Sequence, residues 1–244
     1  MPRLHVDLPL ATGLEAALPA GAARHVQVLR LQPGERITLF DGGGCDWDAE
    51  LLRIGRSEVR VRVGTAAAVD RELPLAVTLA VGMPANERMD WLVEKATELG
   101  AAAIQPLVCE RAVLRLAGER AERRRAHWLG VAAAAAEQCG RARLPRIEPL
   151  QSLAGWCAAS AAAPGAGFVL SLAPGARPFA EALCPAVRAG APLRLLSGPE
   201  GGLSAAEDAA ARAAGLQPVT LGGRVLRAET APLAALALLA GLCG

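Results

Sequence analysis

The first third of the chain shows the alternation of apolar and polar residues that short β-strands require. RITLFDG (36–42) alternates in this way and ends in Asp-Gly, which is a signal of a hairpin turn. Two more strands are predicted in WDAELLRIG (47–55) and SEVRVRVG (57–64), and the three valines of the second share its inward face. Residues 1–68 are therefore expected to form a small β-barrel.

Beyond TAAAVDRELP (65–74), the pattern changes to apolar runs that alternate with amphipathic helices, which is typical of an α/β domain with a parallel sheet. MDWLVEKATELG (89–100) predicts a helix that ends at its glycine, and ERRRAHWLGVAAAAAEQCG (122–140) predicts a longer one. The expected strands are residues 75–82, 103–109, 168–174, 193–198 and 218–223. Residues 74–244 are therefore predicted to form one α/β domain.

The two ends of the chain carry no pattern of an export or membrane segment. MPRLHVDLPL lacks a basic region followed by a long apolar core, so we expect no signal peptide. APLAALALLAGLCG (231–244) is too short to span a bilayer and is expected to form a buried helix. Six cysteines lie far apart without a C-x-x-C pair, which excludes the common zinc spacings and favours reduced thiols. We expect a cytoplasmic protein with no membrane partner and no metal.

Charge changes this picture in one region only. The formal net charge is +2, so the protein is not a polycation that coats nucleic acid indiscriminately. Residues 111–146, however, contain nine arginines against three glutamates. This local excess is the one basic field that favours contact with nucleic-acid phosphates.

A glycine-rich turn late in the chain is the strongest candidate for a ligand site. In SGPEGGLSAAE (197–207), the glycines follow an apolar strand, and Ser204-Ala-Ala-Glu207 has the pattern of a capping box that begins a helix. Ligands of open α/β sheets bind at such strand-to-helix turns, although a purely structural turn also explains Gly201-Gly202. The chain lacks G-x-x-x-x-G-K-[ST] and an early G-x-G-x-x-G. An uncharged adenine or ribose is therefore favoured over a phosphate.

A second loop sharpens this hypothesis. LGGRVLRAETA (221–231) joins the last strand to the final helix, with Thr230 as the expected N-cap and Pro232 in the first turn. Leu221, Val225 and Leu226 are too apolar for a solvated loop. We expect these side chains to wall a pocket.

Together these loops closely resemble the signature of the SPOUT methyltransferases, and within them the bacterial 16S ribosomal RNA uridine N3-methyltransferase family. Further matching motifs occur in the family's order and cover nearly the whole chain: HVQVLRLQPGE (25–35) with LFDG, EKATELG (94–100), LVCER (107–111) and EQCGRARLP (137–145). The resemblance implies an α/β SPOUT domain with a C-terminal trefoil knot, preceded by a PUA-like β-barrel. It also implies S-adenosylmethionine as cofactor, 16S rRNA of the 30S subunit as substrate, and a homodimer.

The resemblance assigns the cofactor to three loops around Ser171-Leu172, 197–202 and 221–230. The expected cofactor-binding residues are Leu172, Ser197, Gly198, Glu200, Gly201, Gly202, Leu221, Gly222, Val225, Leu226 and Thr230. Glu200 either touches the substrate or accepts a hydrogen bond from a neighbouring backbone N–H. Ala228 stands where the family usually has threonine, which removes a hydroxyl beside the cofactor loop.

Two charged residues of the last loop are candidates for catalysis. Methylation at N3 of uridine removes a weakly acidic proton, which calls for a proton acceptor and a cation that stabilises the anion. We assign Arg227 to the stabilisation of the anion and Glu229 to the movement of the proton. The alternative is that these two side chains pair with each other or with Arg224 and merely brace the loop.

RNA contacts are expected outside the cofactor loops. The candidate RNA-binding residues are Arg3, Arg24, Arg30, Arg111, Gln138, Arg141 and Arg143. Arg120 and Arg123–Arg125 are better explained as a solvated helix face, and the four tryptophans as core or interface residues. The three histidines are isolated and are interpreted as structural or RNA-facing rather than as a metal site.

Two rival functions remain open at this point. A ribose 2′-O-methyltransferase of the same fold needs groups that activate a sugar hydroxyl, whereas the N-terminal barrel and LRAETA favour the base enzyme. A non-catalytic RNA-binding or ribosome-assembly factor would have lost its cofactor, but the glycines at 198, 201, 202 and 222 are intact.

Overall fold

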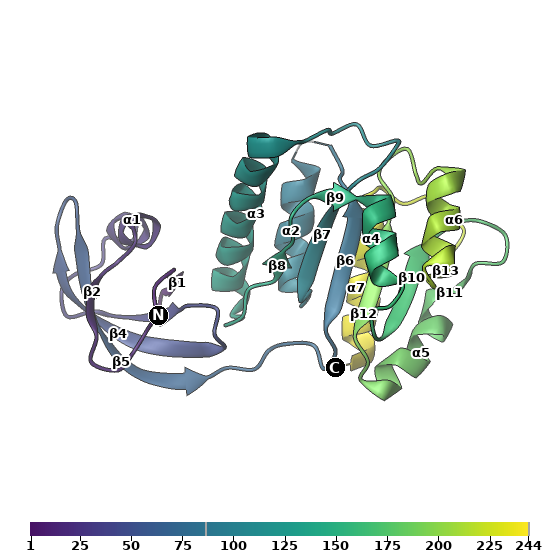
Figure 1. Ribbon diagram of the computed structural model, residues 1–244. Helices are drawn as coiled ribbons and strands as arrows, with labels where there is room; N and C mark the ends of the chain where they lie inside the picture. The colour runs from purple at the N-terminus through teal and green to yellow at the C-terminus, as the bar shows by residue number, and fades with distance from the viewer. Residues whose placement is uncertain (86, 244) are drawn as a thin grey trace. The chain divides into compact units, whose positions relative to one another are not determined.

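The computed structural model describes residues 1–85 and 87–243, which divide into two compact units (Figure 1). The first unit comprises Met1–Glu72 together with Ala133–Leu144, and the second comprises Leu73–Ala132 together with the residues from Pro145 onward. The sequence pattern placed all of 74–244 in one domain. The structure instead groups the short segment 133–144 with the N-terminal residues.

The first unit is a five-stranded sheet in the order β1-β3-β4-β5-β2, with helix α1 and the end of a long helix that begins in the second unit. Its elements are β1 (Arg3–His5), β2 (Glu15–Ala17), α1 (Ala20–Val28), β3 (Arg36–Phe40), β4 (Cys45–Ile54) and β5 (Val59–Ala68). The three predicted strands are confirmed, and β3 and β4 form the expected antiparallel hairpin. Val59, Val61 and Val63 are all buried in the core of this unit, as the alternation predicts.

Long-range hydrogen bonds attach the segment 133–144 to the N-terminal residues. The Arg3 guanidinium donates to the backbone carbonyls of Ala136 and Arg141. The backbone N–H of His5 donates to a carboxylate oxygen of Glu137 at 2.8 Å, and the backbone N–H of Gly44 donates to the carbonyl of Ala142. These long-range bonds explain why the end of a helix groups with residues that lie 98 to 138 positions earlier in the chain.

The second unit is built on a parallel sheet in the order β11-β13-β10-β12-β6-β7-β8, with β9 paired to β7 off this path. Its strands are β6 (Val77–Gly82), β7 (Ala103–Val108), β8 (Arg146–Ile147), β9 (Gln151–Ser152), β10 (Ala166–Leu170), β11 (Arg177–Pro178), β12 (Leu193–Ser197) and β13 (Gln217–Thr220). All five predicted strands are present. The three additional strands have only two residues each.

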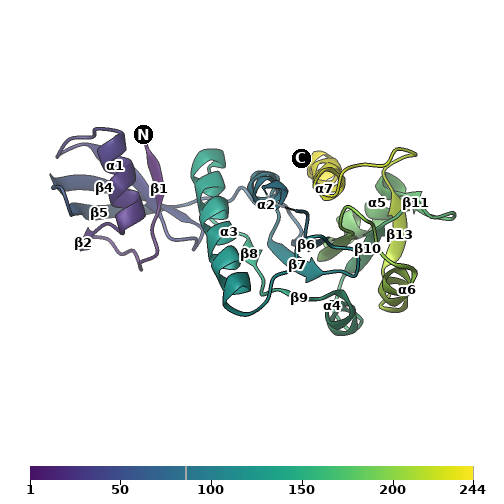
Figure 2. The same ribbon diagram turned by 90° about the horizontal axis from the view of Figure 1, so that it is seen from above.

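Helices cover both faces of this sheet. They are α2 (Arg88–Glu98), α3 (Gly118–Cys139), α4 (Leu153–Ser160), α5 (Phe179–Ala189), α6 (Ala205–Ala213) and α7 (Thr230–Cys243). Helix α7 packs against α2 and α5, whereas α4 packs against α6 on the opposite face (Figure 2). The main core lies on the α2–α7 side, and a smaller core lies under α4 and α6. Both predicted helices end before glycines of positive φ, Gly100 and Gly140.

Helix α7 departs from the expectation of a buried helix. Leu233, Leu236 and Leu239 are buried, but Leu238 and Leu242 are exposed. The helix is apolar on every side, whereas the sheet and its neighbours cover only part of its circumference, so apolar side chains remain on the outside. Within the described ranges, no helix combines the length and the hydropathy that crossing a bilayer requires.

Candidate functional site

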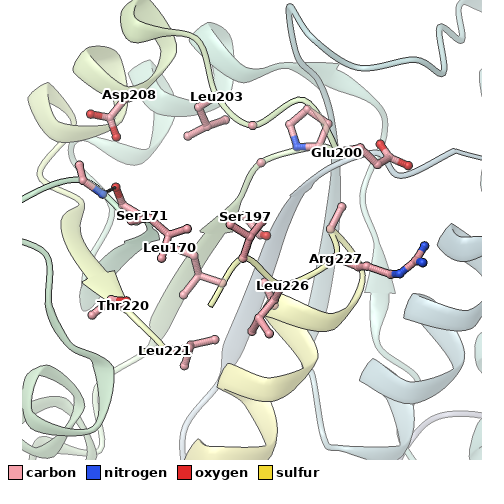
Figure 3. Close-up of a pocket in the computed structure, with 18 of the residues that line it drawn as sticks. Leu170, Ser171, Ser197, Glu200, Leu203, Asp208, Thr220, Leu221, Leu226 and Arg227 are labelled. Carbon is pink, nitrogen blue, oxygen red and sulfur yellow. Dashed lines mark hydrogen bonds between the residues drawn. The ribbon is translucent and has the colours of Figure 1, made fainter. Parts of the chain in front are cut away.

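Three loops meet at the carboxyl ends of β10, β12 and β13 and enclose a cavity of about 640 Å³. This edge is where ligands of open parallel sheets bind. Figure 3 shows Ser171 and Asp208 at one end of the cavity, and Glu200 and Arg227 at the other. Leucines 170, 221 and 226 lie between these ends, so the cavity has an apolar middle and polar extremities.

The glycine-rich turn is tightly fitted to its neighbours. Gly202 has a φ of +69°, which side chains rarely adopt. A Cβ on Gly201 would lie 2.9 Å from the Cβ of Arg111, and a Cβ on Gly82, at the end of β6, would lie 2.5 Å from the Cδ of Pro199. The glycines therefore allow the turn to lie against two neighbouring strand ends.

The predicted capping box is confirmed at the start of α6. The backbone N–H of Glu207 donates to the Ser204 hydroxyl at 3.3 Å, and the Ser204 N–H donates to the Glu207 carboxylate at 2.9 Å. The other carboxylate oxygen of Glu207 accepts from the backbone N–H of Glu110, which follows β7. Glu207 thus ties the helix start to a neighbouring strand end as well as capping it.

The last loop lines the cavity, with two corrections to the expected roles. Val225 is a lining residue but is 84% exposed, so Leu221 and Leu226 form the apolar wall more than Val225 does. Thr230 is the first residue of α7 and not its N-cap. The backbone N–H groups of Thr230 and Ala231 already donate to the carbonyl of Arg227, so the turn into the helix begins earlier.

Most of the predicted cofactor residues are brought together by the fold. Those that line the cavity are Leu172, Ser197, Gly198, Glu200, Gly202, Leu221, Gly222, Val225 and Leu226. Gly201 and Thr230 do not line it. The sequence reasoning missed Asp208 and Arg88, which both line the cavity. Asp208 was detectable because it lies one turn after the capping serine, whereas Arg88 had no local signal.

The charged end of the cavity is organised around Arg88. The backbone N–H of Ala85 donates to Glu200 Oε1 at 2.8 Å, which confirms the second interpretation of Glu200. Arg88 Nη1 lies 3.4 Å from the same oxygen, and Arg88 Nε lies 3.9 Å from Glu229 Oε1. Glu229 is therefore braced by Arg88 and not, as the alternative supposed, by Arg227 or Arg224.

Arg227 and Glu229 differ sharply in their surroundings. Arg227 is exposed and forms no ion pair among the described residues, and Figure 3 shows its side chain on the same side as Glu200. Glu229 is only 8% exposed and does not line the cavity, although the neighbouring Ala228 does. Its Oε2 has no hydrogen-bond partner in the part of the chain that the structure describes.

Two of the predicted RNA-binding arginines are structural. Arg3 pairs with Asp46 at 2.6 Å, lies 4.0 Å from the centroid of the Phe40 ring, and exposes only 12% of its side chain. Arg141 exposes 3% of its side chain and forms a two-point ion pair with Glu72. Neither guanidinium can reach a phosphate without breaking these contacts, which favours a structural role for both over the predicted contact with RNA.

The other RNA candidates remain on the surface. Arg24, Arg30, Gln138 and Arg143 are exposed in the first unit. Arg111 is exposed in the second unit, where Nη1 donates to the carbonyls of Gly201 and Leu203 at 3.3 and 3.4 Å. In α3, Arg123 pairs with Glu119, as expected of a solvated face.

The histidines and cysteines offer neither a metal site nor an activated nucleophile in the described ranges. No cluster of potential metal ligands occurs there, and His127 instead pairs with Asp90. Burial raises the pKa of the Cys109 thiol to about 12 and also raises the pKa of Cys157. Because a nucleophilic cysteine must be a thiolate, these two thiols are unsuited to covalent catalysis.

Comparisons with known families match both units. The RNA methyltransferase domain family matches residues 71–240, and the RNA methyltransferase PUA domain family matches residues 18–64. The chain is 36% identical to ribosomal RNA small subunit methyltransferase E of a Synechocystis strain, over 86% of this chain and 67% of that protein. It is 33% identical to the Bacillus subtilis protein of the same name, over 86% and 83% of the two chains.

Two solved structures resemble the fold along its whole length. Ribosomal RNA small subunit methyltransferase E from Neisseria gonorrhoeae, bound to S-adenosyl methionine, has a TM-score of 0.90 and 37% identity, covering 99% of this chain and 98% of that one. A Legionella pneumophila protein described as a putative methyltransferase, in complex with the same cofactor, has a TM-score of 0.85 and 31% identity, covering 99% and 97%.

Proposed function

The chain belongs to the RNA methyltransferase family, and from this premise we propose that it methylates N3 of a specific uridine in 16S ribosomal RNA with S-adenosylmethionine as donor. It has an α/β fold of the SPOUT class with a parallel sheet and a PUA-like domain at the N-terminus. The observation that carries the proposal is the cavity at the carboxyl ends of β10, β12 and β13. The two similar structures described above were solved with S-adenosylmethionine bound.

The residues present fit this donor. When bound, S-adenosylmethionine supplies an electrophilic methyl group on a positively charged sulfur. Leu221 and Leu226 offer apolar surface for an adenine, and the turns at Gly198 and Gly222 expose backbone groups for hydrogen bonds. Asp208, one oxygen of which is paired with Arg212 at 2.6 Å, adds a carboxylate at the opposite end from Arg227, and its other oxygen suits a ligand with cationic groups.

At the other end of the cavity, the charged residues Arg227 and Glu229 are assigned to the reaction at the uracil. The base must be unpaired for N3 to face the donor, because this atom lies on the pairing edge. Arg227 is exposed at the cavity and stabilises the anion that forms when the N3 proton leaves. Glu229 lies behind the cavity wall, next to Ala228, and one of its carboxylate oxygens has no partner among the described residues, so we assign the movement of that proton to Glu229.

The proposal includes a homodimer and a knotted C-terminal segment. Trp91 on α2 and Leu238 and Leu242 on α7 are exposed apolar residues of two adjoining helices, a composition that favours burial against a second copy. The knot is supported by the strand order, because β10 lies between β13 and β12 while α7 packs back against β12 and α2. Action on ribosomal RNA implies a cytoplasmic location.

RNA phosphates are proposed to contact the arginines that remain exposed. In the first unit these are Arg24, Arg30 and Arg143, and the exposed Gln138 near the end of α3 joins them. In the second unit the exposed arginine is Arg111. Each phosphate contact releases counterions, so the affinity for RNA falls steeply as salt rises. A flat salt response argues against this footprint.

The direct test is the product. The purified protein is incubated with labelled donor and either assembled 30S subunits or free 16S RNA from a strain that lacks the gene, and the nucleosides are identified by mass spectrometry. We expect 3-methyluridine, with Arg227→Ala slower but equal in donor affinity. A 2′-O-methyl nucleoside refutes the proposed methylation of the base. The absence of binding heat in calorimetry with S-adenosylmethionine refutes the proposal that the protein is an active methyltransferase.

A further inference from the structure

Arg88 joins three segments that the sequence did not connect. It is the first residue of α2, it contacts Glu200 on the glycine-rich turn, and it faces Glu229 on the last loop. The N–H of Ala85, just before this helix, donates to the same Glu200 oxygen that Arg88 approaches. A single guanidinium therefore lies between two carboxylates that belong to the two loops of the cavity.

Glu229 needs such a partner. Its side chain is nearly buried, and a buried carboxylate without a counter-charge is strongly unfavourable. Arg88 is the only cation within 4 Å of it among the described residues. The distance of 3.9 Å, from Arg88 Nε to Glu229 Oε1, is an ion-pair distance and not a hydrogen bond. The other oxygen, Oε2, is buried and has no hydrogen-bond partner among the described residues.

We propose that Arg88 is a positioning residue for methyl transfer: it neutralises the buried Glu229 and so fixes the loop that presents Arg227 to the cavity, while Glu200 holds Arg88 in place. This inference rests on the proposed function, since it assigns the support of the loop that carries that reaction's charged residues. Arg88 undergoes no covalent change.

Arg227 does not replace Arg88 in this role. Arg227 is exposed at the cavity without an ion pair in the described ranges, which leaves it available to the substrate. Arg88 is engaged with two carboxylates at once, and its own side chain is less than half exposed. The two arginines therefore have different roles: Arg227 meets the substrate anion, and Arg88 holds Glu229 and its loop in place.

The test compares Arg88→Met, which keeps the length of the side chain without its charge, with Arg88→Lys, which keeps the charge. Single-turnover methylation of 30S subunits, donor affinity by calorimetry and thermal unfolding are measured for each. Arg227 meets the uracil and not the donor, so its displacement slows the chemical step without affecting donor binding. Arg88→Met is therefore expected to lose about 10- to 100-fold in rate with unchanged donor affinity. Arg88→Lys is expected to recover most of this loss.

A double variant separates positioning from bracing. If Arg88 acts through Glu229, Arg88→Met combined with Glu229→Gln is no slower than Glu229→Gln alone. If Arg88→Met does not fold, Glu200→Gln serves instead, because its amide oxygen still accepts the Ala85 N–H while the charge that holds Arg88 is lost. Arg188→Met, on the exposed surface of α5, is the matched control and should behave as wild type.

Three outcomes overturn the assignment. They are a normal rate for folded Arg88→Met, rate losses that multiply in the double variant, and a fall in thermal stability alone. These results leave the proposed function intact as long as the wild type makes 3-methyluridine. A wild type that makes none overturns the proposed function, and the role of Arg88 falls with it.

Discussion

Substitution of Gly82 by alanine tests how closely the glycine-rich turn is fitted to the sheet. Gly82 ends β6, and a Cβ there would lie 2.5 Å from Cδ and 2.6 Å from N of Pro199, and 2.9 Å from Sγ of Cys109. Non-bonded carbon atoms prefer separations of about 3.5–4.0 Å. Two of these three atoms belong to a proline, whose backbone and ring cannot rotate away, so the turn itself must move.

The expected magnitude follows from two opposing effects. Overpacking of a close-packed site destabilises a protein by about 1–3 kcal/mol. Alanine also restricts the unfolded chain, which offsets about 0.4–1 kcal/mol of that loss. The net destabilisation is therefore about 1–2 kcal/mol, or a fall in Tm of about 2–4 °C for each kcal/mol. Because Pro199 lines the cavity, donor affinity should fall as well.

Thermal unfolding and calorimetry with S-adenosylmethionine measure the two effects separately. Gly130→Ala is the matched control, because Gly130 lies inside α3 and a Cβ there meets nothing within 4 Å. This control should gain about 0.5–1 kcal/mol from the better helix propensity of alanine and keep its donor affinity. A Gly82→Ala protein as stable as wild type, with the same affinity, refutes the claim that strand end and turn are in close contact.

Three further predictions concern stability. Arg141→Met should destabilise the first unit by about 3 kcal/mol, because it leaves the partly buried Glu72 without its cation, and chemical denaturation measures this. Ser204→Ala should cost about 1 kcal/mol by thermal unfolding, since it removes the hydroxyl that caps α6. Burial lowers the pKa of His5 below 6.5, so at this residue the unfolded chain binds a proton more readily than the folded chain does. The free energy of unfolding should therefore decline as pH falls below 6.5. His5→Gln should weaken that decline, and unfolding curves measured at several pH values check this.

The regular elements were predictable where the pattern is long enough to show a period. The alternating valines of β5, the helix α2 ending before Gly100 and the capping box of α6 each depend on residues within a few positions of one another. Strands β8, β9 and β11 have two residues each, which is too short for any period. They exist only because a neighbouring strand supplies their hydrogen bonds.

The cavity was predictable from its loops, but its charges were not. Glycines with positive φ and apolar loop residues are local signals, and they identified most of the cavity wall. Arginines carry no such signal, because the same side chain serves a phosphate or a carboxylate. Arg3 and Arg141 were assigned to RNA although Asp46 and Glu72 hold them from 43 and 69 residues away.

By itself, therefore, the sequence determined the fold class, the family and the two loops that shape the cavity, because these follow from backbone conformation and from spacing along the chain. Tertiary structure alone decided which charges are available. It buried two arginines in ion pairs, left Arg227 open to the cavity, and set Arg88 between Glu200 and Glu229. The physical reason is that a charged side chain is paired or available according to the residues that folding places beside it, and those residues lie far away in the chain.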